Sequence, residues 1–271
     1  MDARLQRRIQ RYGWDMAAQD YEPLWEAQLA RARSALLSLA AIEAGEQVLD
    51  VACGTGLVTL DAARDTGPTG RVVGVDISGE MVDAAQRRAR ALRLDNVSFA
   101  RMGAETLALP DASFDVALCA LGLMYVPDPL QALQEMHRVL RPGGRVALAV
   151  WGERANCGWS PVFPIVDAEV RSDVCPLFFS LGQQDALANL CADAGFRNVR
   201  ECRVTTTLDY TDAETACNAA FVGGPVAMAW SRFDDRAKAR VFARYRDAIA
   251  PWRIGDAYAI PGEFVIVAGV R

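Results

Sequence analysis

A glycine turn between two apolar segments is the feature that most constrains how this chain of 271 residues can fold. The segment QVLDVACGTGLVTL, residues 47–60, passes from an apolar run into a helical pattern through Gly54 and Gly56. Glycine at such a junction lets the backbone approach a ligand without an intervening Cβ atom. Asp76 follows at the end of the next apolar run, where a carboxylate is suited to accept both hydroxyls of a ribose. The turn therefore predicts a site for a nucleotide-like ligand at the carboxyl ends of parallel strands.

The pattern around this turn predicts an α/β fold. Near-continuous apolar runs alternate with helical patterns at short spacing, which is typical of a parallel sheet covered on both faces. We expect a doubly wound, mostly parallel seven-stranded sheet with helices on both faces. The expected strands are residues 47–52, 71–77, 97–102, 115–122, 145–151, 199–210 and 262–270. The expected helices between them are residues 57–65, 80–92, 129–140, which the RPGG turn ends, and about 183–195.

Composition excludes several classes of protein. A net charge of −5 without a cluster of Lys and Arg is a poor match for nucleic acid. No stretch approaches the roughly 20 apolar residues of a membrane span, and the first 15 residues lack the apolar core of a secretory signal. The seven cysteines form no CxxC pair, so we expect reduced thiols and a cytoplasmic protein.

Asp50 narrows the choice of ligand. It lies where the strand meets the turn, and a carboxylate there repels a diphosphate but suits a cation such as the ammonium of an amino acid. The dinucleotide fingerprint also places a third glycine where this chain has Thr59. A ribose joined to a cationic amino-acid tail describes S-adenosylmethionine. Two alternatives remain at this point: Asp50 only caps the turn, or the chain is a nicotinamide-dependent oxidoreductase on the same architecture.

Four segments in the expected order carry a family resemblance. VLDVACGTG, GVDIS with the following EM, AETLALPDASFDV and EMHRVLRPGGRVAL resemble the successive motifs of class I S-adenosylmethionine-dependent methyltransferases. The group they most resemble is that of the ubiquinone/menaquinone biosynthesis C-methyltransferases, also called the methyltransferase-11 group. The resemblance covers residues 46–151. It implies a Rossmann-like fold, S-adenosylmethionine as cofactor and a methyltransferase enzyme.

The resemblance also implies which residues hold the cofactor. The turn would line the methionine part, the second strand and its helix would hold the ribose and adenine, and the third and fourth strands would end at the adenine amino group and the sulfonium. These residues are, in that order, Asp50, Ala52, Cys53, Gly54, Thr55 and Gly56; Asp76, Ile77 and Met81; Gly103, Ala104 and Glu105; Ala120 and Leu121. Gly103 stands where the family usually has a carboxylate, so Glu105 or a backbone carbonyl would have to take the adenine contact.

Methyl transfer requires alignment and a dry site more than it requires a special side chain. The sequence after the fourth strand has neither the N/D-P-P-aromatic motif of nucleic-acid methyltransferases nor clustered carboxylates, so we expect no metal. His137, the single histidine, is expected to pack in a helix. The segment 1–45 resembles the helical lid of related small-molecule methyltransferases and precedes the cofactor domain, residues 46–271, with substrate-recognition insertions at about 152–182 and 210–260.

Aromatic residues in the lid and in two loops are the candidates for the acceptor site. Tyr21 is the candidate polar group near the reacting centre. The remaining candidates, with core packing as the alternative for each, are Tyr12, Trp14 and Trp25 in the lid and Met124, Tyr125, Trp151, Trp159 and Phe163 after the fourth and fifth strands. They suggest a small apolar or aromatic acceptor, methylated on O, N or C. A cofactor-binding scaffold or regulator without turnover is the non-enzymatic alternative. The sequence makes no prediction of the oligomeric state.

Overall fold

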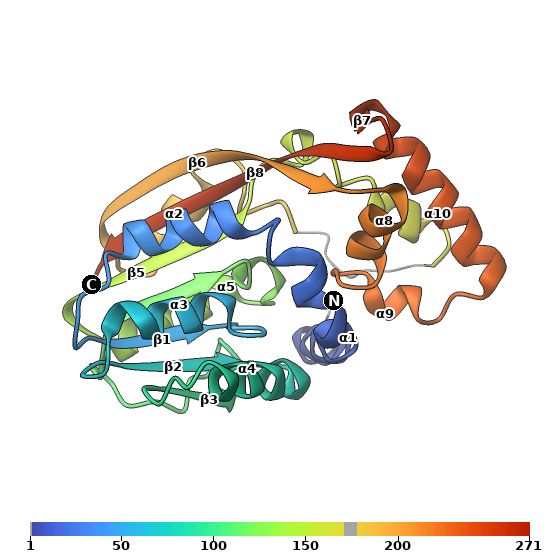
Figure 1. The fold of residues 1–271 in the computed structure, drawn as a ribbon. Coiled ribbons are helices and arrows are strands. Elements are labelled where there is room, and N and C mark those ends of the chain that lie inside the picture. The colour runs from blue at the N-terminus through green and yellow to red at the C-terminus, as the bar shows by residue number, and fades with distance from the viewer. Residues whose placement is uncertain (1, 171–177) are drawn as a thin grey trace.

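A computed structural model describes residues 2–170 and 178–271 of the chain (Figure 1). Part of the first predicted insertion, residues 171–177, lies outside this range, and so does the prediction that Cys175 is a reduced thiol. The six described cysteines form no disulfide. In the described part of the chain, no helix is long and apolar enough to cross a membrane.

The core is one sheet in which seven strands follow the order β3-β2-β1-β4-β5-β8-β6. The five strands from β3 to β5 pair in parallel, and β8 joins β5 and β6 in antiparallel pairing. A two-residue strand, β7, pairs with the far end of β8. The predicted mostly parallel sheet is therefore confirmed. Its strands are β1 (Gln47–Val51), β2 (Arg71–Asp76), β3 (Val97–Arg101), β4 (Phe114–Ala120), β5 (Leu140–Trp151), β6 (Arg197–Tyr210), β7 (Arg253–Ile254) and β8 (Ala257–Val270).

Helices cover both faces of the sheet. The chain moves one way along the sheet from β1 to β2 and the other way from β4 to β5, so right-handed crossovers place α3 and α5 on opposite faces. α2 lies beside α3, and α7 contacts α5. In Figure 1, α2 and α3 lie in front of the strands. These helices are α2 (Ala30–Ala40), α3 (Leu57–Thr66), α4 (Gly79–Ala91), α5 (Pro129–Val139) and α7 (Ala186–Asp193).

The RPGG segment differs from the sequence prediction. It ends α5 as expected, but residues 141–144 lie inside β5, where the pairing passes from Phe114–Leu140 to Val116–Arg145. The extra residues form an irregularity of the strand, and Gly143 takes a positive φ of 81° there. The strand therefore starts five residues earlier than the apolar pattern predicts.

The N-terminal helix α1 (Ala3–Trp25) lies between the sheet and a group of helices inserted before β8 (Figure 1). It contacts α4 on the sheet side and α8 and α9 on the other side. These contacts place one long helix over the carboxyl ends of the strands. The remaining elements are η1 (Leu123–Tyr125), η2 (Arg154–Asn156), α6 (Val162–Asp167), α8 (Ala213–Phe221), α9 (Ala227–Trp230), α10 (Asp235–Ile249) and η3 (Ala250–Trp252).

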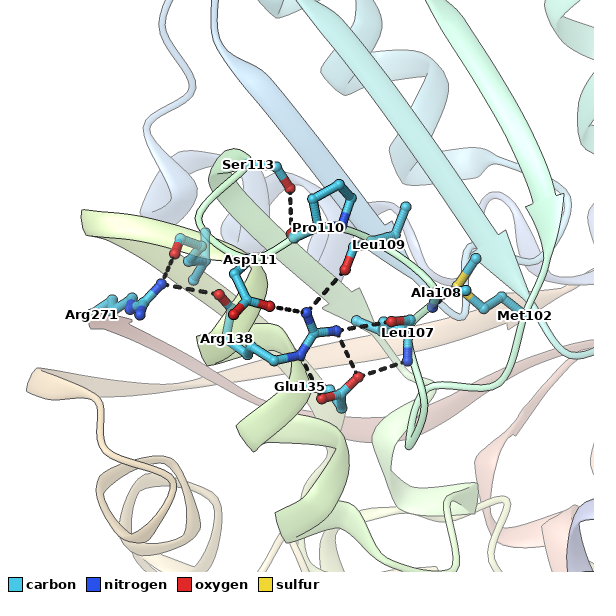
Figure 2. Close-up of polar contacts among 11 residues, drawn as sticks. Met102, Leu107, Ala108, Leu109, Pro110, Asp111, Ser113, Glu135, Arg138 and Arg271 are labelled. Atoms are coloured by element: carbon cyan, nitrogen blue, oxygen red, sulfur yellow. Dashed lines mark hydrogen bonds and ion pairs between the residues drawn. The ribbon is translucent and has the colours of Figure 1, made fainter.

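Arg138, at the end of α5, fixes the loop between β3 and β4 (Figure 2). Its guanidinium donates to the carbonyl oxygens of Leu107 and Leu109 at 2.8 and 2.9 Å and pairs with Asp111 at 2.5 Å. Glu135 accepts from Arg138 Nε at 2.8 Å and from the backbone N–H of Leu107 at 2.8 Å. These contacts keep the pKa of Glu135 below its usual value. Arg138, the first arginine of the HRVLRPGG motif, thus anchors the loop that follows β3.

Replacing Arg138 with methionine should lower the free energy of unfolding by about 2–3 kcal/mol, because several loop carbonyls and two carboxylates lose a charged donor together. Urea denaturation followed by circular dichroism measures the change. Arg141→Met is the matched control: Arg141 pairs with Asp115 and its side chain is 44% exposed, so its loss should cost less than about 1 kcal/mol. Equal effects of the two substitutions would contradict the anchoring role.

Candidate functional site

Two loops meet at the carboxyl ends of β1 and β4. In the first loop Ala52, Gly54 and Gly56 all have a positive φ, of 56°, 55° and 84°. In the second loop Leu121 has a φ of 59°, and a Cβ atom on Gly122 would lie 2.3 Å from the Cβ atom of Ala52. A side chain at position 122 would therefore push the two loops apart.

Asp76 links the glycine loop to the next helix. Its Oδ2 accepts from the N–H of Gly54 at 2.9 Å, and its Oδ1 accepts from the N–H of Ser78 at 2.8 Å. Burial raises the pKa of Asp76 to about 6, although these two hydrogen bonds oppose the shift. Each carboxylate oxygen has a second lone pair, so Asp76 can hold the loop and still accept a hydroxyl from a ligand.

Asp50 is a buried carboxylate of which one oxygen forms a hydrogen bond and the other forms none within the described residues. It is 1% exposed, and its Oδ2 accepts from the Thr59 hydroxyl at 2.5 Å. Within the part of the chain that the structure describes, its Oδ1 has no hydrogen-bond partner, and neither has the buried hydroxyl of Thr55. Burial raises the pKa of Asp50 to about 7, and the Thr59 hydrogen bond partly offsets the shift. A buried acceptor without a partner is costly, so this arrangement suits a cationic ligand.

Three adjoining cavities surround these loops. The outer cavity, about 760 Å³ with its mouth included, has Asp76, Ile77 and Met81 among its lining residues. The inner cavity, about 480 Å³ with its mouth included, lies against the glycine loop and is lined in part by Asp50. The aromatic chamber, about 320 Å³ measured in the same way, lies beneath α1. Tyr21 and Leu121 line all three cavities, so they mark the point where the three meet.

The structure brings most of the predicted cofactor residues together. Of the fourteen, Gly56 alone lines none of the three cavities; its hypothetical Cβ atom would instead lie 3.3 Å from the Cβ atom of Ala85. The others line the outer cavity, the inner cavity or both: Asp50, Ala52, Cys53, Gly54, Thr55, Asp76, Ile77, Met81, Gly103, Ala104, Glu105, Ala120 and Leu121. Their individual roles remain predictions.

The predicted acceptor residues separate into two groups. The aromatic chamber is lined by Trp14, Tyr21, Trp25, Met124, Tyr125, Trp151 and Trp159. Tyr12 is 48% exposed on α1, under the guanidinium of Arg11, and lines none of the three cavities. Phe163 packs against the rings of Trp159, Phe178 and Phe179, away from the lining. The structure thus places Tyr12 and Phe163 apart from the other candidates.

Gly103 and Glu105, the two residues predicted to lie at the adenine amino group, have different surroundings. A Cβ atom on Gly103 would meet nothing within 4 Å. Both oxygens of Glu105 are engaged: Oε2 pairs with Arg7 of α1 at 2.7 Å, and Oε1 accepts from the N–H of Asp128 at 3.0 Å. Glu105 therefore ties α1 to the cofactor domain, which leaves the predicted adenine contact to a backbone group or to a second lone pair.

Several lining residues were not found from the sequence. Arg7 and Gln10 face the outer cavity, Arg33 faces the inner cavity, and Gly223 and Pro225 close the aromatic chamber. Arg33 pairs with Asp61 at 3.0 Å and is the one cation among the residues that line the inner cavity. These residues come from helices or distant loops with no local motif. Only the helical spacing of Arg7, Gln10, Trp14 and Tyr21, which places them on one face, carries a signal.

The titratable groups of the site are mainly uncharged or hydrogen-bonded. Burial, followed by the negative charge of Asp76, raises the pKa of Tyr21, so this phenol stays protonated and acts as a hydrogen-bond donor. His137 packs on the ring of Phe196, at 5.0 Å between centroids, and lines none of the three cavities, as expected for a packing residue. Among residues 2–170 and 178–271, no three His, Cys, Asp or Glu side chains are grouped as a metal site requires.

Comparison with known proteins places this site in a family. Residues 42–171 match the family described as "Methyltransferase domain". This segment is similar to methyltransferase domains. The match spans β1 to β5 and includes both loops of the site, and the resemblance to S-adenosylmethionine-dependent methyltransferases of the ubiquinone/menaquinone type is confirmed.

Two curated relatives support the assignment over the same part of the chain. The demethylmenaquinone methyltransferase of Listeria welshimeri is 37% identical over 131 residues, which are 48% of this chain and 56% of that protein. The ubiquinone/menaquinone biosynthesis C-methyltransferase UbiE of Hahella chejuensis is 38% identical over 146 residues, 54% of this chain and 57% of that one. The chain thus spans little more than half the length of the curated relatives it matches.

Solved structures share the fold across most of the chain. A putative methyltransferase from Bacillus halodurans superimposes with a TM-score of 0.62 at 20% identity, covering 89% of this chain and 98% of that one. The [4+2]-cyclase SpnF superimposes with a TM-score of 0.58 at 23% identity, covering 88% of this chain and 79% of that one. The methyltransferase fold of this domain therefore does not by itself define the reaction.

Proposed function

We propose that this protein transfers the methyl group of S-adenosylmethionine to a small apolar or aromatic metabolite, on O, N or C, by in-line displacement and without a metal. The observation that carries the proposal is the unpartnered Oδ1 of Asp50, buried beside the glycine loop in the inner cavity. An ammonium group would satisfy this oxygen, whereas a diphosphate would be repelled. We further propose, from the sequence, that the protein acts in the cytoplasm.

The residues of the two cofactor cavities fit the two ends of S-adenosylmethionine. Asp50 would take the ammonium, Arg33 is the cation available for the carboxylate, and the orphaned Thr55 hydroxyl offers a further hydrogen bond. Asp76 would accept the ribose hydroxyls while Ile77 and Met81 pack on the adenine in the outer cavity. When bound, the cofactor supplies an electrophilic methyl group on a sulfonium.

Tyr21 and Leu121 would lie beside the reacting atoms, because they line both cofactor cavities and the aromatic chamber. The protonated phenol of Tyr21 would orient an acceptor by donating a hydrogen bond. The rings of Trp14 and Tyr125, 5.1 Å apart, would exclude water from the same junction. The protein's contribution is thus alignment in a dry site.

The aromatic chamber supports an uncharged aromatic acceptor. Among the described residues that line it there is no Asp, Glu, Lys, Arg or His, and six of them are aromatic. Among residues 2–170 and 178–271, the buried indole N–H of Trp159 has no hydrogen-bond partner, which favours an acceptor that carries an oxygen. The curated relatives are named for demethylmenaquinone and for ubiquinone/menaquinone biosynthesis, and an oxygenated aromatic ring is consistent with both the names and the chamber.

Calorimetric titration with S-adenosylhomocysteine tests the cofactor assignment. We expect micromolar binding that is lost in Gly54→Val and in Asp76→Ala, since the first fills the close approach to the ligand and the second removes the ribose acceptor. NADH is the control ligand and should give no heat. Binding of NADH without binding of S-adenosylhomocysteine would overturn the proposal in favour of a nicotinamide enzyme.

Transfer of a radiolabelled methyl group separates an enzyme from a cofactor-binding scaffold. The protein is incubated with labelled S-adenosylmethionine and a library of phenols, quinols and aromatic amines. We expect label in an uncharged oxygenated aromatic compound, and loss of turnover with cofactor binding retained in Trp159→Phe. Cofactor binding without turnover on any compound would favour the scaffold.

A further inference from the structure

The helix α1 has two faces of different character. Arg7, Gln10, Trp14 and Tyr21 point toward the outer cavity. On the opposite side, next to the contacts of α1 with α8 and α9, Leu5, Tyr12 and Met16 are 38%, 48% and 51% exposed, and Met16 Sδ accepts from the Ser231 hydroxyl at 3.5 Å. Because these three are seven and four residues apart, they lie within about 40° of one another around the helix. They are three of the five large hydrophobic side chains exposed in the described part of the chain, so they form one apolar stripe.

A basic groove runs beside this stripe. It is lined by four arginines of α1 and by Arg101 at the end of β3, and its one acidic lining residue, Glu105, is paired with Arg7. In the described ranges, Arg4, Arg8, Arg11 and Arg101 form no ion pair with any of the neighbouring carboxylates. The expectation of no Lys and Arg cluster is therefore wrong for α1, where positive charge is concentrated on a chain of net charge −5.

We propose that the outer face of α1 docks on an anionic lipid bilayer. Arginines attract anionic headgroups, and an apolar stripe enters the boundary between headgroups and acyl chains. Both features lie on one helix, side by side, which matches a surface-lying amphipathic helix better than a site for a free anion, since a free anion needs no apolar stripe. The charge complementarity selects an anionic rather than a neutral membrane.

The docking face adjoins the cofactor site. The basic groove and the outer cavity share Arg7, Ile77, Met102, Gly103 and Glu105. A bilayer bound to the outer face of α1 would therefore lie against the helix whose inner face covers the cavity. The inference stands on α1 itself and does not depend on the identity of the methyl acceptor.

Cosedimentation with vesicles tests the proposal on the full chain. The vesicles are phosphatidylcholine alone or phosphatidylcholine mixed with phosphatidylglycerol, each at low and at high salt. We expect binding to the mixed vesicles only, weakened by salt. Arg4/Arg8/Arg11→Gln should reduce the partition coefficient at least tenfold, and Leu5→Ser/Met16→Ser should also reduce it.

Matched variants elsewhere on the surface control for charge and hydrophobicity. The charge control is Arg71/Arg93/Arg200→Gln, which removes exposed arginines at the start of β2, just after α4 and in β6. The hydrophobic control is Leu92→Ser/Ile254→Ser, which removes the other two exposed large hydrophobic side chains. Both control variants should bind vesicles as the unmodified chain does. S-adenosylhomocysteine titration reports whether each variant is folded.

Three outcomes would overturn the proposal. The first is no binding to the mixed vesicles, and the second is equal binding to both kinds of vesicle. The third is an equal loss of vesicle binding in the control variants. A change in oligomeric state of Leu5→Ser/Met16→Ser by gel filtration, without vesicle binding by the unmodified chain, would assign this face to a second copy of the chain instead.

Discussion

Replacing Asp50 with asparagine is expected to weaken binding of S-adenosylhomocysteine about 100-fold or more, because the cofactor's ammonium loses its buried ionised partner. The loss should depend on pH. With a pKa of about 7 in the free protein, Asp50 is largely protonated at pH 6 and ionised at pH 8, which contributes about tenfold, so that together with the roughly twofold contribution of Asp76 the unmodified protein should bind about 20-fold more tightly at pH 8. Titration calorimetry at both values measures the difference, which should shrink to about twofold in Asp50→Asn, the remainder being due to Asp76.

The same substitution should stabilise the free protein. Because folding raises the pKa of Asp50 from its ordinary value of 3.8 to about 7, the folded state is favoured when this group is protonated. That stability is fully present below pH 3.8 and is lost as the pH rises through 7. Asp50→Asn should therefore raise Tm at pH 8 and change it little at pH 5.

Asp95→Asn, at the amino-end edge of the sheet, is the control for both measurements and should change neither affinity nor Tm. Unaltered cofactor affinity in Asp50→Asn would contradict the assignment and would show that this carboxylate only supports the turn. Because asparagine can still accept the hydroxyl of Thr59, the fold of the turn should persist in either case.

Gly122→Ala is expected to weaken cofactor binding more than tenfold and to destabilise the fold by about 1–3 kcal/mol. The new methyl group would lie 2.3 Å from the Cβ atom of Ala52, so the two loops that form the floor of the site must separate. Gly103 lines the same cavity, and a Cβ atom there would meet nothing within 4 Å. The control Gly103→Ala should therefore change neither stability nor cofactor affinity. Chemical denaturation and titration calorimetry measure the two effects.

A second substitution should reverse the damage. Ala52→Gly/Gly122→Ala lacks the Cβ atom of residue 52 that the new methyl group would meet. Glycine adopts the φ of 56° at position 52 without strain. The double variant should therefore regain most of the stability and affinity that Gly122→Ala loses. If the double variant stays as damaged as the single variant, the contact between the two loops is not the cause.

The sequence predicts the central sheet and the glycine loop well because their signals are local. Apolar runs at short spacing specify β1 to β5, and the residues that flank each strand end, such as Asp50 and Asp76, reach the site by strand geometry alone. The irregularity at residues 141–144 was missed because a Pro-Gly-Gly segment has the composition of a turn, and only pairing with β4 keeps it in a strand.

The walls of the site were predicted less well because they depend on tertiary contacts. Nothing near Gly223, Pro225 or Arg33 in the sequence indicates that these residues line the cavities of the site. Glu105 shows a different limit. Its motif was found from the sequence, but its carboxylate pairs with Arg7 of α1, 98 positions away, and the motif does not indicate this pairing. Tyr12 shares a helix with Trp14 and Tyr21 but lies on the opposite face, which composition alone does not distinguish.

The position of β8 has a consequence for synthesis on the ribosome. Among the described strands, β6 pairs with β8 alone, and β8 lies some 50 positions later in the chain. A nascent chain therefore carries residues 197–210 as an unpaired fourteen-residue strand until residues 257–270 have emerged. During that interval the parallel half of the sheet can already assemble, while the exposed edge of the later strand is open to association with other chains.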